Sequence, residues 1–176
     1  MRDFVYENFT HVLCALLLLA KLGDNISTRL ITPTLKLEAN PLARKLKWGF
    51  IWLTLAICLL PYYSTTLAVM ALTVFLMISA SNFGRVWQAR VLGEDEIDRL
   101  SLVIARRSSL GQALWPRVVS ALYVSAVGGL LIFLEYPGDN WGFWVGMGII
   151  LYAAVILGYG ALALTRLFRR ARAEPS

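Results

Sequence analysis

Charged residues are scarce in this sequence, and their scarcity excludes a water-soluble fold. They make up 16% of the 176 residues, and hydrophobic residues make up 58%. Soluble domains carry about 25% charged residues. Several segments are instead apolar over roughly the 20 residues that a helix needs to cross the bilayer core. We therefore expect an all-α, polytopic membrane helix bundle, with residues 1–176 forming a single integral membrane domain.

Residues that build metal centres and disulfide frameworks are also few. Two cysteines, Cys14 and Cys58, cannot form a framework. The single histidine, His11, excludes a bis-histidine haem and a histidine-rich metal centre. The phosphate-binding loop, the HExxH zinc helix and the GxSxG elbow are absent from the sequence. The sequence thus indicates no catalytic residue and no evident cofactor, and a divalent cation is the one cofactor that we consider below.

The net charge of +6 does not indicate a nucleic-acid partner. The basic residues cluster at the ends of the apolar segments, and this pattern reflects membrane topology and attraction to anionic lipids. We therefore expect membrane lipids, and no nucleic acid, among the partners.

Turn and cap residues divide the apolar sequence into five segments. Pro33 ends the first. Asn40 followed by Pro41 is a typical start for the second, because Asn caps a helix and Pro suits its first position. Pro61 lies in a turn before the third, and Pro116 marks the start of the fourth. We predict five transmembrane helices over about residues 8–31, 41–60, 64–90, 116–134 and 141–167, followed by a basic tail over residues 168–176.

The segment between the third and fourth predicted helices is amphipathic. It begins with the acidic run 94–98, which favours a helix N-terminus. A short apolar stripe follows, made of Ile97, Leu100, Val103 and Ile104. We expect this segment to lie on the cytoplasmic membrane surface, and a helix in a soluble loop is the alternative.

Basic residues fall almost entirely on one side of this five-helix arrangement. The first loop, the third loop and the tail share that side and carry most of the arginines. The opposite side carries the acidic turn that contains Glu135. Because positively charged loops stay in the cytoplasm, we predict an outside N-terminus and an inside C-terminus. The protein would then be a multi-pass protein of the cytoplasmic (inner) membrane.

Small residues recur at four-residue spacing in the last two predicted helices. They are Ala121, Ser125 and Gly129 in the fourth, and Gly142, Gly146, Ala154 and Gly158 in the fifth. Such rows allow helix backbones to approach closely in lipid. The short turn between these helices predicts an antiparallel hairpin, and a homo-oligomer or hetero-complex interface is the competing use.

Polar residues gather at the end of the first predicted helix, the start of the second and the end of the third. Lys21, Asp24, Asn25 and Thr28 recur at i, i+3, i+4 and i+7, which places them on one helix face. The predicted topology brings all three groups to the cytoplasmic side. The candidate binding residues are Asp24, Asn25, Thr28, Glu38, Asn40, Asn82 and Arg85.

Two kinds of ligand fit these side chains. Carboxylate, amide and hydroxyl oxygens suit a hard cation such as Mg²⁺ or Ca²⁺. The basic residues nearby, including Arg44 and Arg85, suit the phosphate of a lipid headgroup instead. A purely structural interpretation also exists, in which Lys21 pairs with Asp24 and Asn40 only caps a helix.

The order Asp24-Asn25-Ile26-Ser27-Thr28, followed by Glu38-Ala39-Asn40-Pro41, resembles an uncharacterised family of small prokaryotic integral membrane proteins. That family has an Asp, then a Ser/Thr pair, then Glu-x-Asn-Pro, and an Asn near the end of a later helix, which Asn82 matches. The resemblance covers about residues 12–90. It implies a site at these residues and leaves its chemistry open.

Three functions remain open on this evidence. The first is a binding protein, such as a transport component, whose cytoplasmic-leaflet polar pocket holds a cation or a phospholipid headgroup. The second is a structural subunit or assembly factor of a membrane complex. The third is a membrane-embedded enzyme that acts on a lipid-linked phosphate, with Asp24 and Glu38 as metal ligands or as acid and base. Ionisable groups inside membrane helices are usually functional, which favours the first.

Overall fold

Helices make up the fold of the computed structural model, which describes residues 8–38, 40–47, 49–136 and 140–173. Its elements are α2 (Phe9–Ile31), α3 (Pro41–Leu46), α4 (Gly49–Leu55), η1 (Ala56–Leu59), α5 (Leu60–Tyr63), α6 (Thr65–Arg107), α7 (Leu110–Glu135) and α8 (Trp141–Ala173). No strand occurs in these described residues, so the predicted all-α class is confirmed.

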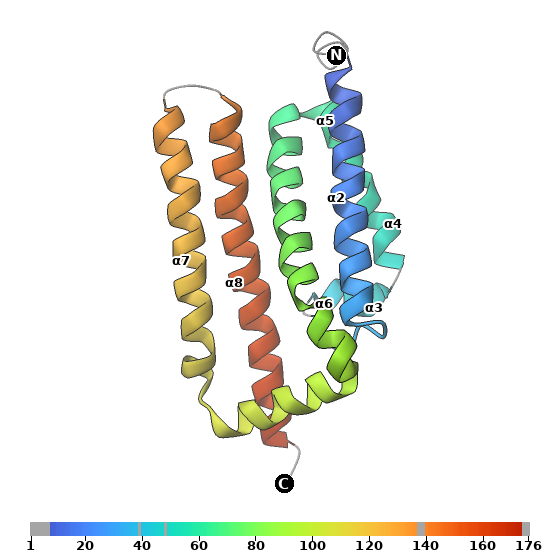
Figure 1. Cartoon of the computed structure of the whole chain (residues 1–176), viewed down its shortest axis with the longest axis vertical. Helices are drawn as coiled ribbons and strands as arrows, with labels where there is room; N and C mark the ends of the chain where they lie inside the picture. Colours follow the sequence, from blue (N-terminus) through green and yellow to red (C-terminus); the bar gives the residue numbers. More distant parts are fainter. Residues whose placement is uncertain (1–7, 39, 48, 137–139, 174–176) are drawn as a thin grey trace.

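Four of these helices, α2, α6, α7 and α8, are long and apolar enough to cross a membrane. Each exceeds the roughly 20 residues that the hydrocarbon core requires. They lie side by side along the long axis of the molecule (Figure 1). Their length and composition support the predicted membrane-spanning bundle.

The prediction of one continuous helix over residues 41–60 is wrong. The chain forms α3, α4, η1 and α5 in succession there, and none of them has more than seven residues. Lys47 ends α3 because its backbone takes a left-handed conformation with φ 51°, and η1 is a tighter 3₁₀ turn. The four pieces still lead from the lower end of α2 to its upper end (Figure 1). The structure thus gives four long spans and does not confirm the fifth.

Helix α6 continues well past the predicted end at residue 90 and bends at Gly93. The backbone of Gly93 has φ 77° and ψ 161°, a conformation that only glycine adopts readily. Residues 94–107 then run across the lower end of the bundle (Figure 1). Ala105 packs there in an apolar cluster with Leu164 and Phe168 of α8. The amphipathic segment is therefore helical, and its buried side faces α8.

Two helix boundaries differ from the predicted ones. Helix α7 begins at Leu110 because Ser109 and Gln112 form a capping box, and Pro116 lies inside the helix. The prediction that Pro116 starts this helix is wrong. Helix α8 extends to Ala173, so residues 168–173 of the predicted basic tail are helical. Residues 174–176 of that tail lie outside the described residues.

Glycines let α8 approach a helix on each side. A Cβ at Gly146 would lie 2.7 Å from the carbonyl oxygen of Gly128 in α7, and a Cβ at Gly148 would lie 2.8 Å from the Cβ of Thr73 in α6. Such contacts leave no room for a side chain, and they confirm the close α7–α8 hairpin (Figure 1). In the predicted row on α7, Ala121 is buried, but the close approach is made by Gly128, and Gly129 faces open space. Gly158 is open as well.

Helices α2 and α6 also cross closely. Ser79 of α6 donates a hydrogen bond of 3.1 Å to the carbonyl oxygen of Ala20. A Cβ at Gly23 would lie 3.3 Å from the Ser79 hydroxyl oxygen. Above this crossing, an apolar core forms around Leu17 and Ala68, neither of which is exposed at all. This crossing fixes the polar end of α2 against the lower half of α6.

Candidate functional site

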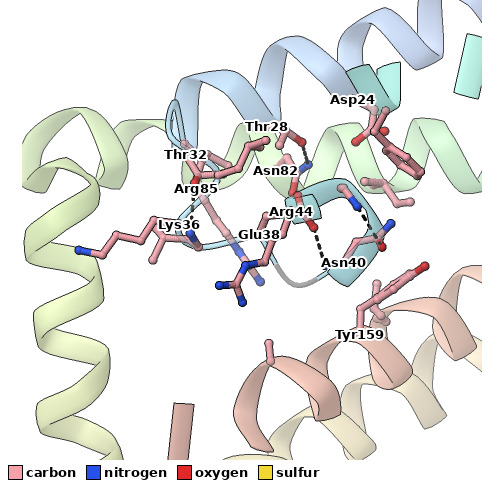
Figure 2. A pocket seen from close by; sticks show the side chains of 18 of the residues that line it. Asp24, Thr28, Thr32, Lys36, Glu38, Asn40, Arg44, Asn82, Arg85 and Tyr159 are labelled. Carbon is pink, nitrogen blue, oxygen red and sulfur yellow. Dashed lines mark hydrogen bonds between the residues drawn. The ribbon is translucent and has the colours of Figure 1, made fainter. Parts of the chain in front are cut away.

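A cavity of about 730 Å³ lies between α2, the segment from α3 to η1, α6 and α8. Figure 2 shows side chains from several of these elements converging on it. All seven residues that the sequence singled out line this cavity, namely Asp24, Asn25, Thr28, Glu38, Asn40, Asn82 and Arg85. The helical spacing in α2 and the shared depth of the three segments therefore bring these residues together.

The Asp24 carboxylate has a partner within its own helix. It accepts a hydrogen bond of 2.6 Å from the Lys21 ammonium, and only 6% of the Lys21 side chain and 13% of the Asp24 side chain are exposed. Lys21 also lies 4.8 Å from the centre of the Phe75 ring in α6, a cation–π distance. The pairing follows the i, i+3 spacing, and it leaves little charge on Asp24 for a ligand.

Glu38 and Asn40 organise the entry to α3. The Glu38 Oε1 atom accepts a hydrogen bond of 2.7 Å from the backbone N–H of Asn40. The Asn40 Oδ1 atom in turn accepts one of 3.0 Å from the backbone N–H of Leu42, which caps the helix. Both side chains line the cavity and are labelled in Figure 2, but these contacts by themselves are structural.

The amides of the site differ in their hydrogen bonding. The Asn82 amide in α6 donates a hydrogen bond of 3.3 Å to the Thr28 hydroxyl in α2. The Asn25 Nδ2 atom, in contrast, is buried and has no hydrogen-bond partner. Every other buried side-chain nitrogen or oxygen of the described residues has one. A buried donor left without an acceptor costs about 1–3 kcal/mol. Asn25 is thus a donor that a bound oxygen atom would satisfy.

Basic side chains outnumber acidic ones around the cavity. Eight lysines and arginines line it, against three acidic residues, Asp24, Glu38 and Asp98. Within the described part of the chain, no acidic group pairs with Arg44, Arg85 or Arg117. Figure 2 shows Arg44 and Arg85 extending into the cavity from one side and Tyr159 of α8 entering from the other. The cavity therefore carries positive charge that the described protein groups do not neutralise.

Arg117 is a lining residue that the sequence analysis missed. Its guanidinium lies against α8, since a Cβ at Gly160 would be 2.6 Å from Nη1. It is also close enough to Arg85 for the two positive charges to repel each other. The misplaced start of α7 had put Arg117 at a helix end, whereas it lies two turns inside the helix.

The acidic groups that line the cavity are engaged by other protein groups. No three His, Cys, Asp or Glu side chains in the described ranges are arranged to hold a metal ion. Asp24 and Glu38 each accept a hydrogen bond from another protein group, as described above. The arrangement therefore favours an anion over a cation as the ligand.

A second polar cluster closes the lower end of the cavity, and sequence reasoning did not find it. Glu94, just after the bend in α6, accepts four hydrogen bonds from the loop after α2. They come from the Thr32 hydroxyl, the Thr34 backbone N–H and hydroxyl, and the Lys36 backbone N–H. The spacing of Glu94, Asp95 and Asp98 at i, i+1 and i+4 was the available signal for a shared helix face.

Asp98 connects the same segment to α8. Its two carboxylate oxygens accept hydrogen bonds of 3.0 and 3.1 Å from Arg170, and Lys36 lies 3.2 Å away. The bidentate Arg170 contact is the main reason that the pKa of Asp98 lies below its ordinary value of 3.8. Burial raises the pKa, and the Lys36 contact lowers it further. The loop, the segment 94–107 and the end of α8 thus form one connected base.

The pKa of Glu94 predicts how this base responds to acid. Glu94 belongs to residues 94–107, which follow the bend at Gly93 and lie outside the apolar, membrane-spanning part of α6. Burial opposes the charged form, but the bonds from Thr32, Thr34 and Lys36 outweigh it and lower the pKa below 4.5. The stabilisation is complete above pH 4.5 and is lost as the pH falls through the lowered pKa.

Substituting Glu94→Gln is therefore expected to lower the free energy of unfolding at pH 7 by roughly 1–3 kcal/mol. The variant should also lose part of the acid sensitivity below pH 4.5. Thermal unfolding of the detergent-solubilised protein at several pH values measures both effects. Glu96→Gln is the control, because Glu96 has only a surface contact of 3.8 Å with Arg99. Equal destabilisation by both variants would contradict the anchoring role of Glu94.

No family model, curated protein or solved structure matches this chain. The family resemblance noted from the sequence therefore stays a prediction, and the function has to be argued from the cavity itself.

Proposed function

We propose that this chain binds a phosphate-bearing anion, the chemistry of a phospholipid headgroup, in the lower half of its cavity. The observation that carries the proposal is a group of lining arginines that pair with no acidic residue in the described part of the chain, namely Arg44, Arg85 and Arg117. Their guanidinium groups concentrate positive charge on the cavity wall, and an anion would neutralise it. The protein would serve as a lipid-binding or transport component of the membrane.

The donors around the cavity suit a phosphate. Arginine presents several N–H groups in a planar fork that matches phosphate oxygens. Asn25 offers a buried N–H without an acceptor, and Tyr159 adds a hydroxyl to the lining. A phosphate carries three or more acceptor oxygens, so it could satisfy these donors together.

The depth of the arginines agrees with a headgroup. Arg85 precedes the bend at Gly93 by eight residues, and Arg117 follows the cap residue Ser109 by eight residues. At about 1.5 Å per residue, both lie roughly 12 Å along the helix from that end of the bundle. In the proposed topology this is the cytoplasmic side of the membrane, because the loop after α2, the segment 94–107 and the end of α8 carry most of the basic residues.

The topology is part of the proposal. Five crossings of the inner membrane, with the N-terminus outside and the C-terminus inside, would use α2, the interrupted segment 41–63, α6, α7 and α8. The support is the path of the chain, since α2 begins at one end of the bundle and α8 ends at the other (Figure 1). Segment 41–63 would cross without forming a single helix.

The enzyme hypothesis has less support. It requires Asp24 and Glu38 to act as a pair on one substrate or metal ion. Asp24 is bound to Lys21, and Glu38 to the backbone of Asn40. The structural-subunit hypothesis depends on Gly129 and Gly158, which face open space, since Gly146 packs against Gly128 within the chain.

Binding of dioctanoyl phosphatidic acid to the purified full-length protein tests the proposal. Arg85→Gln and Arg117→Gln should each weaken binding by about tenfold or more, since a hydrogen bond to a charged group contributes about 1.5–3 kcal/mol. Affinity can be measured by microscale thermophoresis in a non-ionic detergent. Phosphatidylcholine with the same chains should bind less tightly, because its headgroup has no net negative charge.

Arg90→Gln is the matched control for this experiment. It makes the same charge change on α6 at another exposed arginine, but Arg90 does not line the cavity. Its affinity for phosphatidic acid should equal that of the wild type. Equal affinities for all three variants, or equal binding of both lipids by the wild type, would overturn the proposed function.

A further inference from the structure

We infer that the upper half of the same cavity holds hydrocarbon, so that the ligand is a lipid whose acyl chain lies above its phosphate. This inference rests on the proposed phosphate site and adds the chemical class of the molecule that carries the phosphate. It comes from the order in which polar and apolar lining residues follow each other along the elements that surround the cavity.

Helix α6 shows this order first. It runs downward from Thr65 to the bend at Gly93 (Figure 1). Its upper lining residues are the apolar Val74, Phe75 and Ile78, and its lower ones are Asn82, Arg85 and Gln88. The wall that α6 contributes therefore changes from apolar to polar on the way down.

The two other walls also carry their basic residues toward the lower end of the cavity. Helix α8 also runs downward, and its lining passes from Val155 and Ile156 to Arg166 and Arg170. The segment from α3 to η1 runs upward, and its order along the chain is reversed. Its lining begins with Arg44 and Lys47 and continues with Phe50, Ile51 and Ile57. Three elements with different directions thus confine their basic lining residues to the lower half of the cavity and leave an upper half that is mostly apolar.

The charged pair in α2 marks the boundary between the halves. Lys21 is neutralised by Asp24 and covered by the Phe75 ring. It therefore presents little free charge to the apolar region above it. The three arginines that have no acidic partner among the described residues line the lower half, where apolar residues such as Leu164 and Leu167 also line the wall, and the upper half is mostly apolar.

An amphiphile fits such a cavity better than a small anion does. A phosphate ion alone would occupy only the lower half, and an apolar space offers few hydrogen bonds to water. The total volume of about 730 Å³ is within the range of sites that enclose a ligand much larger than phosphate. A lipid would place its phosphate among the arginines and its chain between Ile78, Ile156 and Ile51.

A series of lysophosphatidic acids with increasing chain length tests this inference on the full-length protein in detergent. Glycerol 3-phosphate is the member without a chain. Full burial of one CH₂ group strengthens binding about fourfold. Even if only a few of its ten chain carbons are buried, a lysophosphatidic acid should therefore bind at least tenfold more tightly than glycerol 3-phosphate. Inorganic phosphate should bind no more tightly than glycerol 3-phosphate.

Substituting Ile156→Trp supplies the second arm, because it fills the apolar half without changing the charge. It should remove the dependence on chain length and leave the affinity for glycerol 3-phosphate unchanged. Leu162→Trp is its control, since Leu162 is 47% exposed on α8 and does not line the cavity. The chain-length series on the wild type stands even where Ile156→Trp impairs folding.

The outcomes separate the two proposals. Equal affinity for all chain lengths, together with loss of binding in Arg85→Gln, would overturn the acyl-chain inference and leave the phosphate site intact. Failure of the wild type to bind any member of the series would overturn both. Chain-length dependence that is present in the wild type and in Leu162→Trp, and absent in Ile156→Trp, is the result that we expect.

Discussion

Replacing Lys21 by leucine is expected to lower the free energy of unfolding by roughly 3–5 kcal/mol. The substitution leaves the Asp24 carboxylate nearly buried, with 13% of its side chain exposed, and removes the ammonium 2.6 Å away. An unpaired buried charge is far more costly than the loss of the attraction itself. It also removes the contact between Lys21 and the Phe75 ring. Unfolding in mixed detergent micelles measures the change.

The double variant Lys21→Leu/Asp24→Leu is the control for this prediction. Replacing both members of a buried pair with apolar residues is often neutral, so most of the lost stability should return. Destabilisation by the double variant equal to that of Lys21→Leu would contradict a closed pair.

Replacing Gly128 by alanine is expected to cost about 1–3 kcal/mol of stability, the usual cost of overpacking. The new Cβ would lie 2.7 Å from the carbonyl oxygen of Gly146 and 2.9 Å from Ile150. The first of these atoms belongs to the backbone of α8 and cannot rotate away. The hairpin of α7 and α8 would have to separate along this contact, and thermal unfolding in detergent would report the loss.

Gly129→Ala is the matched control, one residue further along α7. A Cβ at Gly129 meets nothing within 4 Å, so this variant should unfold at the same temperature as the wild type. Equal loss of stability at Gly128 and Gly129 would show that α7 is rotated relative to the packing described above. Destabilisation of Gly129→Ala alone would instead indicate that this glycine contacts another chain.

Much of the bundle was predictable because bilayer crossing is encoded in length and hydropathy. The apolar segments that became α2, α6, α7 and α8 each satisfy that requirement locally. The convergence of the seven candidate residues on one cavity was predictable for a related reason. Helical spacing placed Asp24 and Thr28 on one face, and the expected topology placed Asn82 at their depth, where it bonds Thr28.

The interruption of residues 41–63 was not predictable from the same signals. The stretch GFIWLTLAICLL is apolar apart from Thr54, and it contains no proline that would break a helix. Its division into α4 and η1 depends on packing against α2, and local propensity does not encode that packing. The left-handed conformation of Lys47 also has no sequence signature, because glycine is the usual residue there.

Partner choice was the other part that the sequence could not supply. Glu94 bonds Thr34 across 60 residues, and Asp98 bonds Arg170 across 72. Nothing local distinguishes these carboxylates from the neighbouring Glu96, which has only a surface contact. Gly129 was predicted where Gly128 makes the contact for a similar reason. One residue corresponds to about 100° of rotation on a helix, and only packing against α8 fixes that angle.

The break at Lys47 has a consequence for the lipids around the protein. Where α3 ends and η1 tightens, backbone amide and carbonyl groups lack the regular helical partners. Lipid acyl chains form no hydrogen bonds, so a backbone of this kind is stable at membrane depth only beside protein or water. On the proposed topology, water molecules would therefore enter from the cytoplasm along this segment. The bilayer next to it would be thinner than elsewhere around the molecule.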